Sequence, residues 1–376
     1  MYKLRKAVTY QIHSDFRFNG KSFTSEEFQE EAIQLVRTGE VYEQEIGVFL
    51  KEWFNDKSYI TSYTSGSTGD PKPIRLPKER MINSARATGD FFKVKENTTA
   101  LLCLPARYIA GKMMLVRAMV LGWRLDTVPY RSNPLDHVYR QYDFCAMVPL
   151  QLDNSLNRLH LLKKLIVGGG AVSEHLSRLV QGVSAKIFET YGMTETISHI
   201  AVKRLNPKKK KNIAKPVFKA LPSVTFQTDE RNCLVIKAPN IIDEPLITND
   251  VVELHTYKQF TWKGRYDNVI NSSGIKLYPE EIEKKLEVLI SQRFFVASEP
   301  DDVLGDKLIL VVEQPFEENI YAILEEEIVK LGTLFRYEIP REIYFLPKFM
   351  ETPTGKIQRN ETLNLLYQQN SKSGAS

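Results

Sequence analysis

Residues 63–72 read Tyr-Thr-Ser-Gly-Ser-Thr-Gly-Asp-Pro-Lys and lie at the end of a predicted strand, 59–64. Glycines let the backbone turn sharply and aim its N–H groups inward, and the closely spaced hydroxyls add donors that suit phosphate oxygens. The spacing of a Walker A loop and the Gly-x-Gly-x-x-Gly pattern are both absent. A flexible Gly/Ser linker is the alternative, but the apolar strand before the segment and the Pro-Lys-Pro turn after it favour a phosphate-binding loop.

Around this loop, short β-rich runs alternate with helical patterns up to about residue 191. The predicted strands are 59–64, 99–104, 124–128, 143–148, 164–167 and 186–190. Segments with apolar residues at helical spacing lie between them, as in 112–121 and 173–180. This alternation predicts an α/β fold with mixed, mostly parallel sheets covered by helices.

The pattern changes after about residue 198, where short strands and Pro and Asp/Asn turns predict a small antiparallel β subdomain. After Gly264, a helix beginning at Pro279 and further strands and helices predict a separate α+β unit. We therefore expect an N-terminal domain over residues 1–265, a C-terminal domain over 266–370 and a disordered tail over 371–376.

The composition is that of a globular protein, because 43% of the 376 residues are hydrophobic and 26% are charged. The net charge of +5 is too small for this length to argue for a nucleic-acid partner. The longest apolar stretch, 113–123, is interrupted by Arg117 and is too short to span a bilayer. The first residues lack the apolar run of a signal peptide, so we expect a cytoplasmic protein with no membrane span.

The three cysteines, Cys103, Cys145 and Cys233, lie far apart in the sequence and within apolar runs. No Cys-x-x-Cys pair occurs, so neither a disulfide framework nor a structural zinc site is expected. The pattern predicts buried free thiols in a reducing compartment.

Two further segments have positions and side chains that could bind a nucleotide. Gly168-Gly169-Gly170-Ala171 follows a predicted strand, at the kind of sheet edge where ligands bind in open α/β folds. Residues 191–196, Tyr-Gly-Met-Thr-Glu-Thr, follow the next strand and offer an aromatic ring, hydroxyls and a carboxylate able to hold a hard cation. A helix N-cap explains either segment alone equally well.

Five motifs occur in order along the chain, and together they resemble the adenylate-forming superfamily of acyl-CoA synthetases, adenylation domains and luciferases. The phosphate loop and the 191–196 segment are followed by Thr-Asn-Asp at 248–250, Gly-Arg-Tyr-Asp-Asn-Val-Ile at 264–270 and Pro-Thr-Gly-Lys-Ile at 353–357. The resemblance covers nearly the whole chain. It implies a large N-terminal domain, a mobile C-terminal domain, and ATP, Mg²⁺ and coenzyme A as cofactor and co-substrates.

The resemblance also implies roles for individual residues. The loop would hold the β- and γ-phosphates, the second glycine segment and Tyr191 the adenine, Thr194 the α-phosphate, and Asp250 the ribose with Arg265 beside it. Glu195 would bind Mg²⁺, and Lys356 would neutralise charge on the attacking carboxylate and the α-phosphate, so Lys356, Thr194 and Glu195 are the expected catalytic residues. The expected ATP-binding residues are Thr64, Ser65, Gly66, Ser67, Thr68, Gly69, Lys72, Gly169, Gly170, Ala171, Tyr191, Gly192, Thr194, Asp250 and Arg265.

Members of the superfamily form an acyl-adenylate and then pass the acyl group to a thiol, and the small domain turns between these steps. The resemblance makes Asp267 the hinge and places Ser273 and Gly274 at the pantetheine of coenzyme A. Asn249 departs from the pattern, because the family commonly has glycine there; asparagine tolerates positive φ, so a turn could survive. The phosphate loop also begins early in the chain, which predicts a shortened N-terminal part, or one partly supplied by another subunit, and leaves a homo-oligomer open.

Residues 108–114 and 193–201 are similar to o-succinylbenzoate–CoA ligases of menaquinone biosynthesis. That acid keeps a second carboxylate, which needs a cation or donors when buried. Arg107, Lys112 and His199 are expected to border the acyl pocket; a surface lysine and a core histidine are the alternatives. Two other functions stay open: an aryl or fatty acid adenylating enzyme that loads a carrier protein, and a nucleotide-binding pseudoenzyme.

Overall fold

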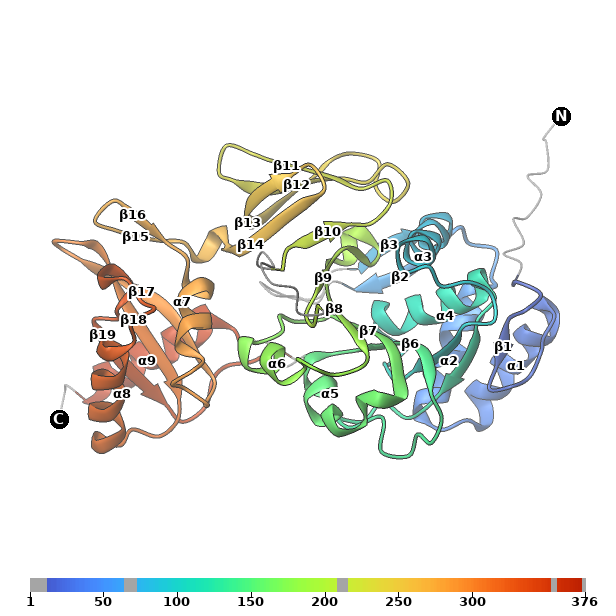
Figure 1. The fold of residues 1–376 in the computed structure, drawn as a ribbon, viewed down its shortest axis with the longest axis horizontal. Coiled ribbons are helices and arrows are strands. Elements are labelled where there is room, and N and C mark those ends of the chain that lie inside the picture. Colours follow the sequence, from blue (N-terminus) through green and yellow to red (C-terminus); the bar gives the residue numbers. More distant parts are fainter. Residues whose placement is uncertain (1–11, 64–72, 208–215, 353–356, 374–376) are drawn as a thin grey trace.

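The structure is a computed structural model that describes residues 12–63, 73–207, 216–352 and 357–373. Its strands form a twelve-stranded, a five-stranded and a two-stranded sheet. Figure 1 shows the five-stranded sheet and its helices at one end of the molecule, beside the larger sheet and the helices that cover it. The predicted α/β class is confirmed.

One half of the twelve-stranded sheet is parallel. In spatial order its strands are β1 (Arg17–Phe18), β5 (Arg124–Thr127), β4 (Thr99–Leu102), β6 (Tyr142–Met147), β7 (Leu162–Val167) and β8 (Lys186–Gly192). Parallel neighbours need long crossover connections, and the helices in those connections cover the faces of the sheet. The strands predicted between 99 and 190 all belong to this half.

Side chains alternate between the two faces along each strand, as the pleat requires. Ala100 and Leu102 lie in one hydrophobic core, whereas Leu101 and Cys103 lie in another. The first core includes residues of α1 (Ser25–Thr38), α2 (Val41–Trp53), α3 (Lys78–Phe92) and α4 (Ile109–Leu121). The second includes residues of α5 (Pro149–Asn154), the 3₁₀ helix η1 (Leu156–Leu161) and α6 (Glu174–Leu179).

The first predicted strand lies outside this sheet. β2 (Tyr59–Tyr63) pairs with β3 (Pro73–Pro77) in an antiparallel two-stranded sheet, with register Tyr63 opposite Pro73. The predicted phosphate loop is therefore the connection of a hairpin rather than the crossover of a parallel strand. Residues 64–72 themselves lie outside the described ranges.

The other half of the large sheet is antiparallel and continues edge to edge from β8. Its strands are, in spatial order, β9 (His199–Arg204), β10 (Phe218–Ala220), β14 (Gln259–Arg265), β13 (Leu246–Thr256), β12 (Cys233–Lys237) and β11 (Thr225–Thr228). The short strands expected after residue 198 are present, and backbone hydrogen bonds join them to the parallel half. Asn249 lies inside β13 without positive φ, so no turn depends on it.

Helix α4 is buried almost all round, as its sequence of apolar residues predicts. It ends at Gly122, which has the left-handed φ of +69° that favours glycine, and the Gly122 N–H donates to the Ala118 carbonyl. Arg117 is 2% exposed in the middle of this helix. A buried cation within an apolar helix is unusual and needs a reason.

The five-stranded sheet carries helices on both faces. Its strands are β15 (Ile270–Ser272), β16 (Ile275–Leu277), β17 (Phe294–Asp301), β18 (Gly305–Glu313) and β19 (Glu342–Leu346). α7 (Pro279–Leu286) and α8 (Glu318–Lys330) pack in one core, α9 (Arg359–Ser373) packs in the other, and the 3₁₀ helix η4 (Arg336–Glu338) precedes β19. The chain passes from the large sheet to this one through η3 (Tyr266–Asn268), next to the domain boundary expected after residue 265.

The cysteines are free and buried, as the sequence predicts. Cys103 and Cys145, distant in sequence, bring their Sγ atoms to 3.8 Å across neighbouring strands. No helix within the described part of the chain is both long and apolar enough to cross a membrane.

Candidate active site

The second glycine segment follows β7 at the carboxyl edge of the parallel strands, where open α/β sheets bind ligands. A Cβ on Gly168 would lie 2.4 Å from Thr190 Oγ1, and Gly169 has a φ of +84°. Glycine therefore allows this backbone to pass close to β8, the neighbouring strand. Gly169, Gly170 and Ala171 are exposed. Their place at this edge is compatible with the predicted adenine contact.

Tyr191 and Asp250, which the motifs place far apart, meet between β8 and β13. The Tyr191 hydroxyl donates to Asp250 Oδ2 at 2.6 Å, and Trp262 Nε1 donates to Asp250 Oδ1 at 3.1 Å. Arg265 Nη1 lies 3.7 Å from the same Oδ1. Burial and the adjacent carboxylate raise the pKa of Tyr191 well above its usual value, so its hydroxyl stays a donor. Trp262, which sequence reasoning missed, thus helps to fix the carboxylate predicted to hold the ribose.

The Tyr191 ring packs between other aromatic rings. Its centroid lies 5.2 Å from that of Phe260, edge-on, and 5.8 Å from that of Phe218. These contacts fix the ring at the sheet edge beside Gly192, the last residue of β8. The predicted stacking on adenine stays a prediction.

Thr194 and Glu195 lie on the 3₁₀ turn η2 (Thr194–Thr196), which packs beside β3. Because β3 carries the chain away from residues 64–72, the expected phosphate loop begins and ends close to this turn. Glu195 is exposed. Mg²⁺ is commonly held by one or two carboxylates together with substrate phosphates and water, and a single exposed carboxylate here fits that pattern. No cluster of three or more potential metal-binding side chains occurs within the described ranges.

Ile197 connects the turn that carries Thr194 and Glu195 to a buried polar group. It has φ +66° and ψ −53°, and Ser198 N donates to Thr196 O at 2.7 Å, which closes a γ-turn. Positive φ is costly for a β-branched residue, on the order of 1–3 kcal/mol. The Ile197 side chain is buried in the core, and this packing holds the strained turn. Sequence reasoning did not identify it.

The buried group is Arg117, whose guanidinium donates from Nη2 to Ser198 Oγ at 2.7 Å and from Nε to Thr88 Oγ1 at 3.3 Å. Nη2 also lies 3.4 Å from His199 Nδ1. Within the described ranges, no carboxylate pairs with Arg117 and no hydrogen-bond partner reaches His199 Nε2.

Burial lowers the pKa of Arg117 to about 9, and burial together with the neighbouring guanidinium lowers the pKa of His199 well below its usual value. The histidine is therefore neutral near pH 7, and no carboxylate among the described residues compensates the positive charge of Arg117. Such a charge is stabilised by an anion. We call Arg117, Ser198 and His199 the buried arginine cluster.

The other expected acyl-pocket residues have partners elsewhere. Arg107 pairs with Glu45 and donates to the Tyr130 hydroxyl at 2.9 Å. Lys112 Nζ donates to the Thr61 carbonyl at 3.2 Å, and burial lowers the pKa of Lys112. The structure therefore joins His199 to Arg117, and it ties Arg107 to α2 and Lys112 to β2. Pocket roles for Arg107 and Lys112 stay predictions.

The remaining expected residues lie on or near the five-stranded sheet. Ser273 and Gly274 form the turn between β15 and β16, both with positive φ, and Asp267 lies in η3. The Pro-Thr-Gly-Lys segment that contains Lys356 lies outside the described residues, as does the first phosphate loop from Thr64 to Lys72. An isolated bridge between Glu351 and Ile357 flanks the Lys356 segment.

Comparison with known proteins shows the family to which the chain belongs. The sequence profile described as AMP-binding enzyme matches residues 7–232, more than half of the chain. The chain belongs to the AMP-binding enzyme family. This confirms the expected superfamily and identifies the protein as an enzyme.

Individual members of the family give a finer comparison. A crystal structure of an acyl-CoA synthetase (AMP-forming)/AMP-acid ligase II-like protein from Dyadobacter fermentans is 35% identical, with a TM-score of 0.58 over 90% of this chain and 98% of that one. A 2-succinylbenzoate–CoA ligase of Bacillus mycoides is 26% identical over 91% of this chain and 78% of its own length. The o-succinylbenzoate coenzyme A synthetase of Bacillus subtilis in complex with ATP and magnesium ion shares the fold at a TM-score of 0.68 and 20% identity, over 92% of this chain and 82% of that one.

Proposed function

We propose that this enzyme is an ATP-dependent acid–CoA ligase that activates o-succinylbenzoate, as in menaquinone biosynthesis. The observation that carries the choice of acid is the buried arginine cluster. Arg117 is only 2% exposed and has no acidic partner among the described residues. The second carboxylate of o-succinylbenzoate would supply the missing negative charge.

In the first half-reaction, an oxygen of the reacting carboxylate attacks the α-phosphorus of ATP, and the bond to pyrophosphate breaks. Positioning and charge stabilisation supply most of the catalysis in such phosphoryl chemistry. Thr194 would donate to the α-phosphate, and Lys356 would approach the attacking carboxylate. Mg²⁺, held by Glu195 and phosphate oxygens, would offset the phosphate charge.

In the second half-reaction, the thiol of coenzyme A loses its proton, and its sulfur attacks the acyl-adenylate carbonyl and displaces AMP. Coenzyme A would approach along the turn that carries Ser273 and Gly274. The strained turn at Ile197 supports this assignment of sites, because it links Thr194 on the phosphate side to Ser198 on the arginine side.

The deciding experiment measures acid-dependent pyrophosphate release with MgATP, with and without coenzyme A. The acids are o-succinylbenzoate, benzoate and a medium-chain fatty acid. We expect sustained turnover only with o-succinylbenzoate plus coenzyme A. Turnover with either other acid would reject the substrate, and a burst that coenzyme A cannot sustain would favour a carrier-protein thiol as acceptor. Absence of release with every acid would support a pseudoenzyme.

A further inference from the structure

The connection between the two large sheets has a set of contacts that the reaction does not explain. β14 ends at Arg265 in the twelve-stranded sheet, and β15 begins at Ile270 in the five-stranded sheet. Any change in the relative orientation of these sheets must alter backbone dihedrals between them, because rotations of packed units are absorbed at such boundaries. We call Tyr266–Asn268 the junction.

Side chains of the antiparallel strands hold the junction. Asn249 Nδ2 on β13 lies 3.3 Å from both Oδ1 and Oδ2 of Asp267. Arg265 Nη2 lies 3.2 Å from Asp267 Oδ2. Asp267 therefore accepts hydrogen bonds from Asn249 on β13 and from Arg265, two residues before it in the sequence.

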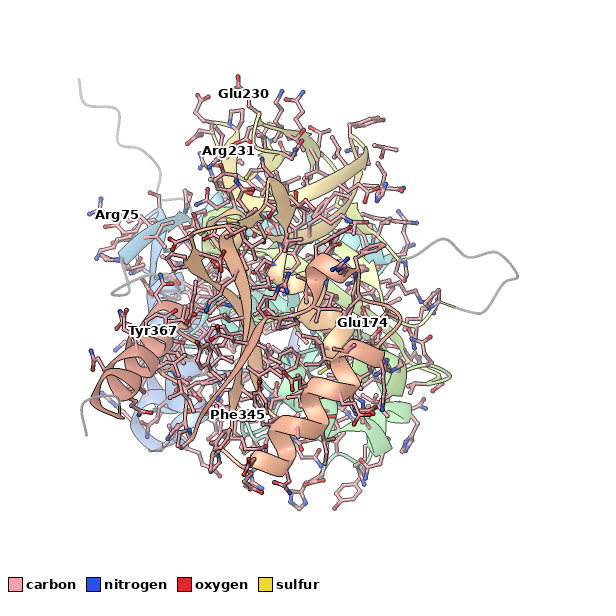
Figure 2. The ribbon with its side chains drawn as sticks, turned by 90° about the vertical axis from the view of Figure 1, so that its left-hand side faces the viewer. Arg75, Glu174, Glu230, Arg231, Phe345 and Tyr367 are labelled. Carbon is pink, nitrogen blue, oxygen red and sulfur yellow. The ribbon has the colours of Figure 1, made fainter. Side chains whose placement is uncertain are left out.

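Asn249 is itself oriented by Arg231. The Arg231 Nη1 atom donates to Asn249 Oδ1 at 3.2 Å, and the Arg231 guanidinium lies 5.0 Å from the Tyr266 ring centroid. Asp229 fixes Arg231 in turn, by accepting from Arg231 Nε at 2.9 Å. Figure 2 labels Arg231, which lies in the turn between β11 and β12, above the five-stranded sheet that faces the viewer.

We propose that Asn249 and Arg231 are positioning residues that clamp the junction and so hold the five-stranded sheet in the orientation of this structure. Glycine or alanine at position 249 could not reach Asp267. Asparagine donates to the Asp267 carboxylate and accepts from Arg231 at the same time. The clamp rests on the proposed function, because it would control the change in sheet orientation between the two proposed half-reactions.

The test measures the orientation directly, by single-molecule energy transfer between dyes on the two parts. Tyr139→Cys and Val303→Cys provide attachment points that are 82% and 88% exposed, and the native cysteines are buried. Asn249→Ala or Arg231→Ala should reduce the population at the distance of this structure about threefold, the size expected of exposed polar contacts. No acid or nucleotide is added, so the result does not depend on which acid the enzyme activates.

Matched variants separate the clamp from general damage. Asn240→Ala removes an exposed asparagine amide after β12 and should leave the distance distribution unchanged. Asn249→Asp places a second carboxylate beside Asp267 and should shift the distribution further, and adding Asp267→Asn should restore it by reversing donor and acceptor. An unchanged distribution in Asn249→Ala and Arg231→Ala, or an equal shift in Asn240→Ala, would overturn the clamp.

Discussion

Arg117 is the residue on which the choice of substrate rests, and its replacement makes a sharp prediction. A charge-assisted hydrogen bond contributes about 1.5–3 kcal/mol, so Arg117→Met should raise the KM for o-succinylbenzoate by about 10- to 100-fold. The KM for ATP should change little, because Arg117 lies on the side of the Ile197 turn that we propose binds the acid. Steady-state kinetics with each substrate varied in turn measures both values.

A stability measurement separates this loss from misfolding. Replacing a buried, unpaired charge by an apolar side chain of similar volume is often neutral or stabilising. Chemical denaturation should therefore give Arg117→Met a free energy of unfolding no lower than that of the parent. Arg117→Lys keeps the charge but loses the fork of donors, and its KM should lie between the two. Equal increases in the KM values for acid and ATP would contradict the assignment.

The sequence shows only part of this site. His199 is identifiable from its motif, whereas Arg117 is visible merely as the charge that interrupts an apolar stretch. Which polar groups its guanidinium meets depends on tertiary contacts between α4 and the residues at the start of β9. Trp262 likewise meets Asp250 only because β13 and β14 pair. Local patterns do not encode such pairings.

Near its start, helix α4 packs closely against the backbone of Pro105, and Gly111 leaves room for this contact. A Cβ on Gly111 would lie 2.3 Å from the Pro105 carbonyl oxygen, in the turn that carries Arg107. Gly111→Ala should therefore lower the free energy of unfolding by about 1–3 kcal/mol, the usual cost of overpacking. Urea denaturation measures the difference. Gly332→Ala is the control, since a Cβ there meets no atom within 4 Å, and an equal loss in both variants would refute this explanation.

The positions of strands are easier to predict from the sequence than the strands with which they pair. The strands from residue 99 to 190 follow from β-rich runs, and they lie in the parallel sheet as expected. The strand at 59–63 has the same local pattern but pairs with β3. Local propensity does not show that the chain turns back after residue 63 to form this antiparallel pair. The predicted elements do not include α1 and α2, although Thr24 and Glu27 form a capping box before the apolar face of α1.

At the scale of the whole molecule, the two parts meet through polar contacts from α7. Lys263 in β14 pairs with Glu281 at 3.0 Å, and Lys284 lies over the Trp262 ring. Glu287, just after α7, accepts from the backbone N–H of Glu174 at 2.7 Å. Glu174, labelled in Figure 2, begins the helix that follows the second glycine segment. The C-terminal part therefore contacts the start of the helix that follows the expected adenine segment.

We expect Glu287 to make this contact sensitive to pH. Burial raises the pKa of Glu287, an effect that the N–H groups of Glu174 and His175 partly offset; among nearby charges Glu174 raises the value and Lys284 lowers it. The docked arrangement thus binds the proton more tightly than a separated one. Docking should strengthen as pH falls through this raised pKa and weaken as pH rises above it.

The same labelled pair of positions, Tyr139→Cys and Val303→Cys, measures docking as a function of pH between about 5 and 8. Glu287→Gln keeps an acceptor oxygen but cannot ionise, so its docked population should be at least that of the parent at neutral pH and nearly independent of pH. Glu317→Gln, an exposed carboxylate on the same part, should keep the parental pH dependence. A pH dependence that survives in Glu287→Gln would assign the sensitivity to another group and leave Glu287 as a simple backbone acceptor.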